Sequence, residues 1–124
     1  MMKLIWVFAG GGLGSVCRYG VAVLVSKYPA LAWSFPVATF LANAVSCIIL
    51  GSLFGLSSRS MLNESQRLLL MTGFCGGFST FSTFTGESLG LLQDGQLLTW
   101  SVYLFLSIVI CLGCFWLGLR LTIQ

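Results

Sequence analysis

Hydroxyl and phenyl side chains alternate in one short segment, and their types and spacing suit the binding of a small ion. Residues 79–84 read Ser-Thr-Phe-Ser-Thr-Phe and follow a glycine pair at 76–77. In a helix, residues three apart share a face, so Phe81 and Phe84 stack beside rows of serines and threonines. Hydroxyl groups donate hydrogen bonds and the edge of a phenyl ring is positive, so this face favours an anion. The alternative is that the hydroxyls bond to carbonyls of their own helix while the rings only pack.

The glycine pair at 76–77 predicts an interruption of the helix that carries these residues, because glycine has a low helix propensity. An interruption inside a membrane frees N–H and C=O groups that protein, water or an ion must satisfy. Broken helices form ion sites in transport proteins in this way. We therefore expect the carbonyl oxygens of Gly76 and Ser79 to be free to hold a small monovalent cation.

Four more polar residues lie inside apolar stretches, where such groups are costly and are therefore candidates for function. Asn43 offers an amide donor, and its alternative role is an interhelical hydrogen bond. Arg18 reaches one membrane surface, where it either attracts anions or bonds to helix-end carbonyls. Glu87 is the only acid inside a span and is either a protonated group or the partner of a cation. Ser107 either continues a polar track or only packs.

The composition of the chain excludes most soluble functions. Hydrophobic residues make up 57% and charged residues 7%, with a mean hydropathy of +0.99. Ordinary globular domains have about 25% charged residues. Six Lys/Arg and three Asp/Glu cannot coat a soluble surface, so a cytosolic enzyme and a nucleic-acid partner are excluded. The chain has no histidine, and its five cysteines lie in apolar stretches, where they are interpreted as small packing residues.

Four apolar stretches position these residues: about 4–26, 34–56, 68–92 and 97–119. Only helices satisfy the backbone of such spans, because the lipid core holds no water. We expect an all-α membrane protein, a single domain of four transmembrane helices with the third broken near mid-membrane. Glycines spaced four apart predict close helix packing and assembly with a second copy. Most positive side chains lie on the side of both termini, which favours termini inside: Lys3, Arg59, Arg67 and Arg120.

Three segments together resemble the signatures of the Fluc (CrcB) fluoride channels. They are the first-helix motif Gly10–Tyr19, the asparagine at position 43 and the third-span run Gly73–Phe84. The resemblance covers essentially the whole chain, including its length and four-span layout. It implies an antiparallel homodimer in the bacterial inner membrane, formed because the chain inserts in both orientations. It also implies two pores that pass fluoride passively, reject chloride and so lower cytoplasmic fluoride.

The resemblance implies roles for individual residues. Phe81 and Phe84 would line the pores, contributed across the dimer, and Asn43 would be a donor beside them. The backbone carbonyls of Gly76 and Ser79 would hold a structural Na⁺ on the twofold axis, which is not transported. Ser82, Thr83 and Thr85 would supply the hydroxyl groups of a polar track. Glu87 would be an acid that relays the anion, and Arg18 would be a vestibule arginine. On the fourth span we choose Ser107 for the polar track.

Two other functions compete with a fluoride channel. A small multidrug-type antiporter also has four spans, but it needs an acid in the first span to exchange protons for cations. The first span here has only Arg18 as a charge. A membrane assembly protein would use the Ser-Thr-Phe run for packing alone. Release of fluoride without chloride from vesicles separates a fluoride channel from both alternatives.

Overall fold

Three long helices and one segmented helix make up the described part of the chain. The computed structural model describes residues 1–28 and 35–123, and these residues form helices and connecting turns with no strand. The long helices are α1 (Met2–Ser26), α2 (Val37–Ser58) and α6 (Leu97–Ile123). Between α2 and α6 lie α3 (Glu64–Gln66), the π-helix η2 (Arg67–Cys75), α4 (Gly76–Phe78) and α5 (Phe81–Gln93). The predicted all-α fold is confirmed for the described residues.

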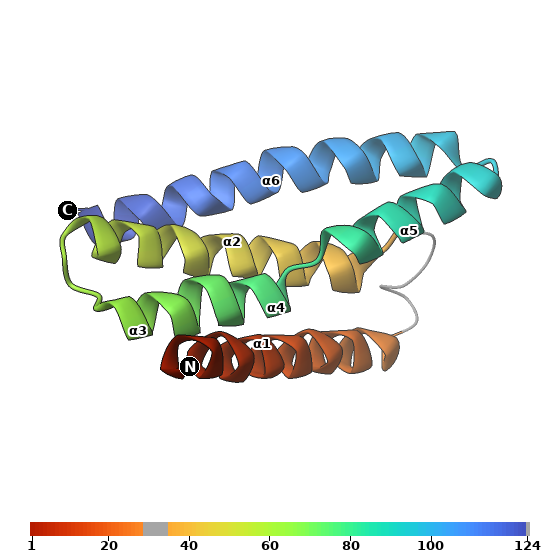
Figure 1. Ribbon diagram of the computed structural model, residues 1–124. Helices are drawn as coiled ribbons and strands as arrows, with labels where there is room; N and C mark the ends of the chain where they lie inside the picture. Colours follow the sequence, from red (N-terminus) through yellow and green to blue (C-terminus); the bar gives the residue numbers. More distant parts are fainter. Residues whose placement is uncertain (29–34, 124) are drawn as a thin grey trace.

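The helices lie side by side in one bundle. Both termini and the α2–α3 connection are at one end, and the α5–α6 turn is at the other (Figure 1). α1 packs mainly on η2 and α4, whereas α2 packs mainly on α6. At the α5–α6 turn, Gly95 has a φ of 72°, a left-handed conformation that favours glycine. Termini that share one end are what four passes across a membrane require.

Three helices are long and apolar enough to cross a membrane among the described residues. α1, α2 and α6 contain 25, 22 and 27 residues, and about 20 residues are needed for a crossing. The predicted third span at 68–92 corresponds to η2, α4 and α5 in succession, so it is not one long helix. The predicted start of the second span at residue 34 lies outside the described residues. The chain is therefore a multi-pass membrane protein.

Glycine faces bring the helices into close contact. A Cβ atom at Gly10 on α1 would collide with the Leu69 carbonyl oxygen and lie 2.9 Å from the Phe74 nitrogen. On the facing segment, a Cβ atom at Gly73 would lie 2.9 Å from the Cα of Gly10. A Cβ atom at Gly77 would collide with the Gly11 carbonyl oxygen. Small residues spaced four apart thus pack backbone against backbone, as the sequence predicts.

The segmented helix is interrupted two residues after the glycine pair. Ser79 (φ −77°, ψ 158°) and Thr80 (φ −151°, ψ 121°) have extended backbone between α4 and α5. Gly76 is helical, with φ −64° and ψ −34°, and Gly77 lies within α4. The prediction that the glycine pair itself interrupts the helix is therefore wrong. Gly77 serves the contact with α1, whereas the helical geometry ends at the extended Ser79, and Thr80 begins α5 as its N-cap.

Candidate functional site

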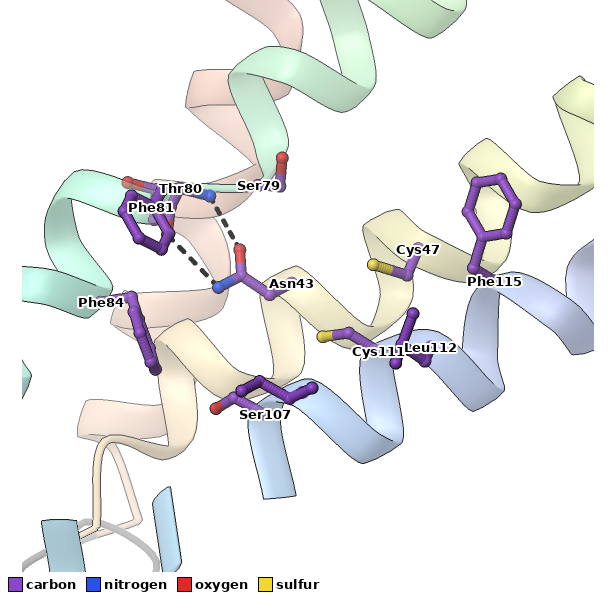
Figure 2. Close-up of a pocket in the computed structure, with 11 residues that line it drawn as sticks. Asn43, Cys47, Ser79, Thr80, Phe81, Phe84, Ser107, Cys111, Leu112 and Phe115 are labelled. Carbon is purple, nitrogen blue, oxygen red and sulfur yellow. Dashed lines mark hydrogen bonds between the residues drawn. The ribbon is translucent and has the colours of Figure 1, made fainter. Parts of the chain in front are cut away.

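The interruption borders a cavity of about 440 Å³ between α2, α5 and α6. Figure 2 shows the polar and aromatic side chains that surround it. They come from the middle of α2, the extended link, the first turn of α5 and the middle of α6: Asn43, Cys47, Ser79, Thr80, Phe81, Phe84, Ser107 and Cys111. No Lys, Arg, Asp or Glu lines this cavity in the described part of the chain. The lining is mostly apolar, since it also includes Ile108, Leu112 and Phe115, and its polar groups are amide, hydroxyl and thiol groups without a full charge among the described residues.

Asn43 bonds to both backbone groups of Thr80. The Thr80 N–H donates to Asn43 Oδ1 at 2.7 Å, and Asn43 Nδ2 donates to the Thr80 carbonyl oxygen at 3.3 Å. Figure 2 shows both bonds crossing from α2 to the extended link. An amide nitrogen has two hydrogens, so one remains for a ligand in the cavity. The predicted interhelical bond is present, and Asn43 also faces the cavity.

The two carbonyl groups predicted to bind a cation lack the partners of a continuous helix. The residue four positions after Gly76 is Thr80, whose N–H donates to Asn43. The residue four positions after Ser79 is Thr83, whose N–H donates to Thr80 Oγ1 at 3.2 Å. By contrast, the Cys75 carbonyl oxygen accepts bonds from Ser79 N at 2.9 Å and from Ser79 Oγ at 2.8 Å. Carbonyl oxygens are hard ligands, so the donor set fits an alkali cation, and the role stays a prediction.

Phe81 and Phe84 form the aromatic side of the cavity. Their ring centroids are 5.8 Å apart with an interplanar angle of 31°, so the two rings neighbour each other as the three-residue spacing predicts. Phe84 also contacts Tyr103, with centroids 5.0 Å apart. The Phe81 side chain is 79% exposed within the single chain. Most of that ring is therefore free to contact something outside this chain.

Glu87 is held by two hydroxyl groups from neighbouring helices. Thr39 Oγ1 on α2 donates to Oε1 at 2.7 Å, and the Tyr103 hydroxyl on α6 donates to Oε2 at 2.8 Å. The partners are neutral, so the prediction of a cationic partner has no support among these two bonds. Sequence reasoning missed Thr39. Its position four residues before Asn43, on the same face of α2, is the signal that would have found it.

The predicted polar-track hydroxyls divide into two groups. Ser82, Thr83 and Thr85 are exposed on α5 and do not line the cavity. Thr85 Oγ1 donates to the Phe81 carbonyl oxygen at 2.9 Å, which is the alternative role of bonding within its own helix. Ser107 lines the cavity and is buried, and its Oγ atom has no hydrogen-bond partner among the described residues. A buried hydroxyl without a partner costs free energy unless a ligand or water satisfies it.

Arg18 lies away from this cavity. It is half-buried on α1, the helix that packs on η2 and α4, and it is not a lining residue. The structure thus brings together five of the predicted residues around one cavity, and Gly76 lies in α4 just before the interruption: Asn43, Ser79, Phe81, Phe84 and Ser107. It leaves Arg18 apart from them within one chain.

Comparison with known proteins places this chain in a family. The model of the CrcB-like, camphor-resistance (CrcB) proteins matches residues 5–119. The chain belongs to the CrcB-like family. A relative from Rhodococcus jostii, named fluoride-specific ion channel FluC 2, is 46% identical over 121 residues, which cover 98% of this chain and 99% of the relative.

Two further CrcB-like relatives carry the same kind of name. The fluoride-specific ion channel FluC of Nitratidesulfovibrio vulgaris is 42% identical over 120 residues, covering 96% of this chain and 95% of the relative. The FluC of Flavobacterium psychrophilum is 38% identical over 120 residues, with the same two coverages. These names describe a membrane channel and not an enzyme, which agrees with the apolar helices and the uncharged cavity of this chain.

Proposed function

We propose that this chain is a fluoride-specific ion channel. The observation that carries the proposal is the cavity beside the helix interruption: among the described residues its lining has phenyl rings, an amide and a buried hydroxyl without a partner, and no charged side chain. The names of the CrcB-like relatives support fluoride as the ion. A channel must bind its ion strongly enough to admit it and weakly enough to release it. Donors without a full positive charge meet that requirement for an anion.

The pore is formed by Phe81, Phe84, Asn43 and Ser107. Fluoride is small and strongly hydrated, so several close donors must replace its water at once. The free Nδ2 hydrogen of Asn43 and the Ser107 hydroxyl supply two hydrogen-bond donors. The positive ring edges of Phe81 and Phe84 supply the remaining favourable contacts to the anion. Chloride is larger and is rejected because the rings and donors surround a smaller ion.

Hydroxyl groups on α5 extend this pathway, and Glu87 relays the anion at its end. Ser82, Thr83 and Thr85 are exposed in the single chain, so a second subunit covers them in the assembly. Arg18 raises the local anion concentration at the vestibule of the assembled channel, because an arginine near a pore mouth attracts anions.

The functional unit is an antiparallel homodimer with two pores and a third helix that is broken near mid-membrane. The exposed Phe81 ring supports a partner subunit, because the single chain leaves most of it uncovered. A structural Na⁺ on the twofold axis is held by the carbonyls of Gly76 and Ser79, whose helical partners are diverted. When bound, the ion would satisfy the carbonyl oxygens of Gly76 and Ser79 in place of the missing helical N–H groups.

The channel lowers fluoride inside a bacterial cell from its place in the inner membrane. Neutral HF crosses the lipid, loses its proton in the less acidic cytoplasm and becomes trapped as fluoride. The ion then leaves through the channel down its own gradient. No energy source is needed, so the flux is passive.

Efflux from vesicles that hold the purified protein tests this proposal. We expect fluoride release, measured with a fluoride electrode, and no chloride release from matched vesicles. We also expect the fluoride rate to fall when external and internal Na⁺ is replaced by a large organic cation. Chloride release at a similar rate contradicts fluoride selectivity, and proton-coupled cation exchange instead of anion release favours the antiporter.

A further inference from the structure

Two thiol groups that the proposed channel does not use lie next to each other in the cavity. Cys47 comes from α2 and Cys111 from α6, and both are half-buried cavity-lining residues. α2 and α6 pack on each other, and both cysteines lie where the two helices border this cavity. Figure 2 shows both sulfur atoms directed to the same side of the two helices, toward Asn43. A single ligand that enters the cavity can therefore meet both sulfur atoms.

Close backbone contacts between α2 and α6, one to two turns beyond the cysteines, hold these thiols in place. On α2, a Cβ atom at Gly51 would lie 2.9 Å from the carbonyl carbon of Phe115. On α6, a Cβ atom at Gly118 would lie 2.9 Å from the Ser52 nitrogen. Because Gly51 and Gly118 have no Cβ atom, the two helix backbones can pack closely, and this packing fixes the register between them. The thiols are thus positioned before any ligand binds, which reduces the cost of binding.

The chemistry of the pair selects the class of ligand. Thiolates are soft ligands that prefer soft metal ions. No group of three or more Cys, His, Asp or Glu side chains arranged for a metal ion occurs in residues 1–28 and 35–123. A four-coordinate zinc site is therefore not formed, whereas two sulfur atoms satisfy a cation that prefers two-coordinate, linear binding. The mercuric ion is the representative of that class.

We propose that Cys47 and Cys111 form a two-thiolate site for a soft cation of the mercuric class, and that its occupation blocks the cavity. Each thiol loses its proton, and two sulfur–metal bonds form, so one divalent ion replaces two protons. The bound ion lies beside Asn43 and in the same cavity as Phe81. The blocking of fluoride rests on the proposed function, whereas binding of the metal does not.

Metal retention tests the binding step on the whole protein in detergent. The probe is Hg²⁺ alone, added in slight excess and then challenged with the monothiol glutathione. When glutathione competes for the ion, a site with two thiolates binds Hg²⁺ about tenfold or more tightly than a site with one thiolate, because the second sulfur–metal bond is intramolecular. We expect the native chain to keep one Hg²⁺, and Cys47→Ser and Cys111→Ser each to lose it. Cys114→Ser is the matched control, since Cys114 lies one turn along α6 and does not line the cavity.

Loss of Hg²⁺ from Cys114→Ser with retention by Cys47→Ser overturns the proposal, because the ligands would then be Cys111 and Cys114 on one helix. Retention by all three variants, or release by the native chain, overturns it as well. Cys47→Ala is a second variant at the same position. Helical content and elution volume show whether each variant is folded. X-ray absorption of the native complex gives two sulfur neighbours if the assignment is right.

Vesicle efflux tests the blocking step separately. Each protein is compared with its own fluoride rate before Hg²⁺ is added. We expect native and Cys114→Ser channels to lose about nine-tenths of that rate or more, and Cys47→Ser and Cys111→Ser to keep most of it. If the native protein binds Hg²⁺ but shows no fluoride efflux even before Hg²⁺ is added, the metal site stands and the proposed channel function is contradicted. Full efflux with Hg²⁺ bound contradicts blocking.

Discussion

Asn43 replaces the helical bonds that the chain loses between α4 and α5. Its amide accepts from the Thr80 nitrogen and donates to the Thr80 oxygen, so both backbone groups of the extended residue are satisfied by one side chain. In the lipid core no water takes over these bonds. The same amide faces the cavity. A residue that holds the interruption open thus also stands where an anion would bind.

Asn43→Ala removes the side chain that bonds to both Thr80 backbone groups. Each buried group left without a partner costs about 1–3 kcal/mol, so we expect a clear loss of unfolding free energy in detergent and a lower fluoride rate. The control is Val45→Ala, an exposed position on the same helix. Equal stability of the two variants would contradict the role of Asn43 at the interruption.

Phe81→Ile and Phe84→Ile each remove a ring edge from the cavity but keep an apolar side chain of similar bulk. We expect each to reduce fluoride efflux about tenfold or more, the change that ~1.4 kcal/mol at the barrier produces. The elution volume of the purified protein should not change. Phe8→Ile is the control, because Phe8 is exposed on α1, away from the cavity. Unchanged efflux in both cavity variants contradicts their role in the pore.

Some site residues could be predicted from the spacing within one helix, whereas the contacts of others depend on how several helices pack together. The spacing of Phe81 and Phe84 is a property of one helix, and their rings are neighbours in the structure. The partners of Glu87 depend on how α2 and α6 align with α5, so only the three-dimensional structure identifies Thr39 and Tyr103 as the residues that bond to it. Glu87 was identified because it is an acid inside an apolar span, but the sequence does not show which hydroxyl groups donate hydrogen bonds to it.

At the scale of elements, glycine faces decide which helices touch. Glycines four residues apart on α1 meet glycines four apart on the η2–α4 segment, with backbone contacts on both sides. This spacing is visible in the sequence, and so the packing of neighbouring helices was predictable. The exact place of the interruption was not predictable from glycine content. Gly77 is used for packing, while the extended geometry follows from the cap at Thr80 and its bonds with Asn43.

A pair of glycine substitutions on α1 tests this packing. A Cβ atom at Gly14 would collide with the Phe74 carbonyl oxygen and lie 2.7 Å from the Phe78 nitrogen, whereas a Cβ atom at Gly12 meets nothing within 4 Å. We expect Gly14→Ala to lower the unfolding free energy by about 1–3 kcal/mol through overpacking. Gly12→Ala should be neutral or stabilise the helix by about 0.5–1 kcal/mol. Unfolding in detergent measures both, and an equal loss in the two variants contradicts the assigned contact face.

At the scale of the whole molecule, the single chain leaves its candidate pore incomplete. Phe81 is 79% exposed, the α5 hydroxyls are uncovered, and the Ser107 hydroxyl has no partner in the described residues. Large apolar side chains are exposed along α1 and α6 as well, which suits both lipid and a second subunit. A second copy would complete the pore by adding groups to the open side of the cavity.

The proposed dimer has two pores, each lined by phenylalanines from both subunits, and this proposal predicts a distinctive result for a covalently linked dimer. Let one subunit contain Phe81→Ile and the other Phe84→Ile. By twofold symmetry both substitutions fall in the same pore, and the other pore keeps two native rings. We expect this dimer to retain about half of the native fluoride rate.

The matched control carries both substitutions in one subunit, so each pore loses one ring and both pores are slow. The reverse order of rates means that each pore takes both rings from one chain. Equal rates mean that the subunits share a single pore, which contradicts the two-pore assembly.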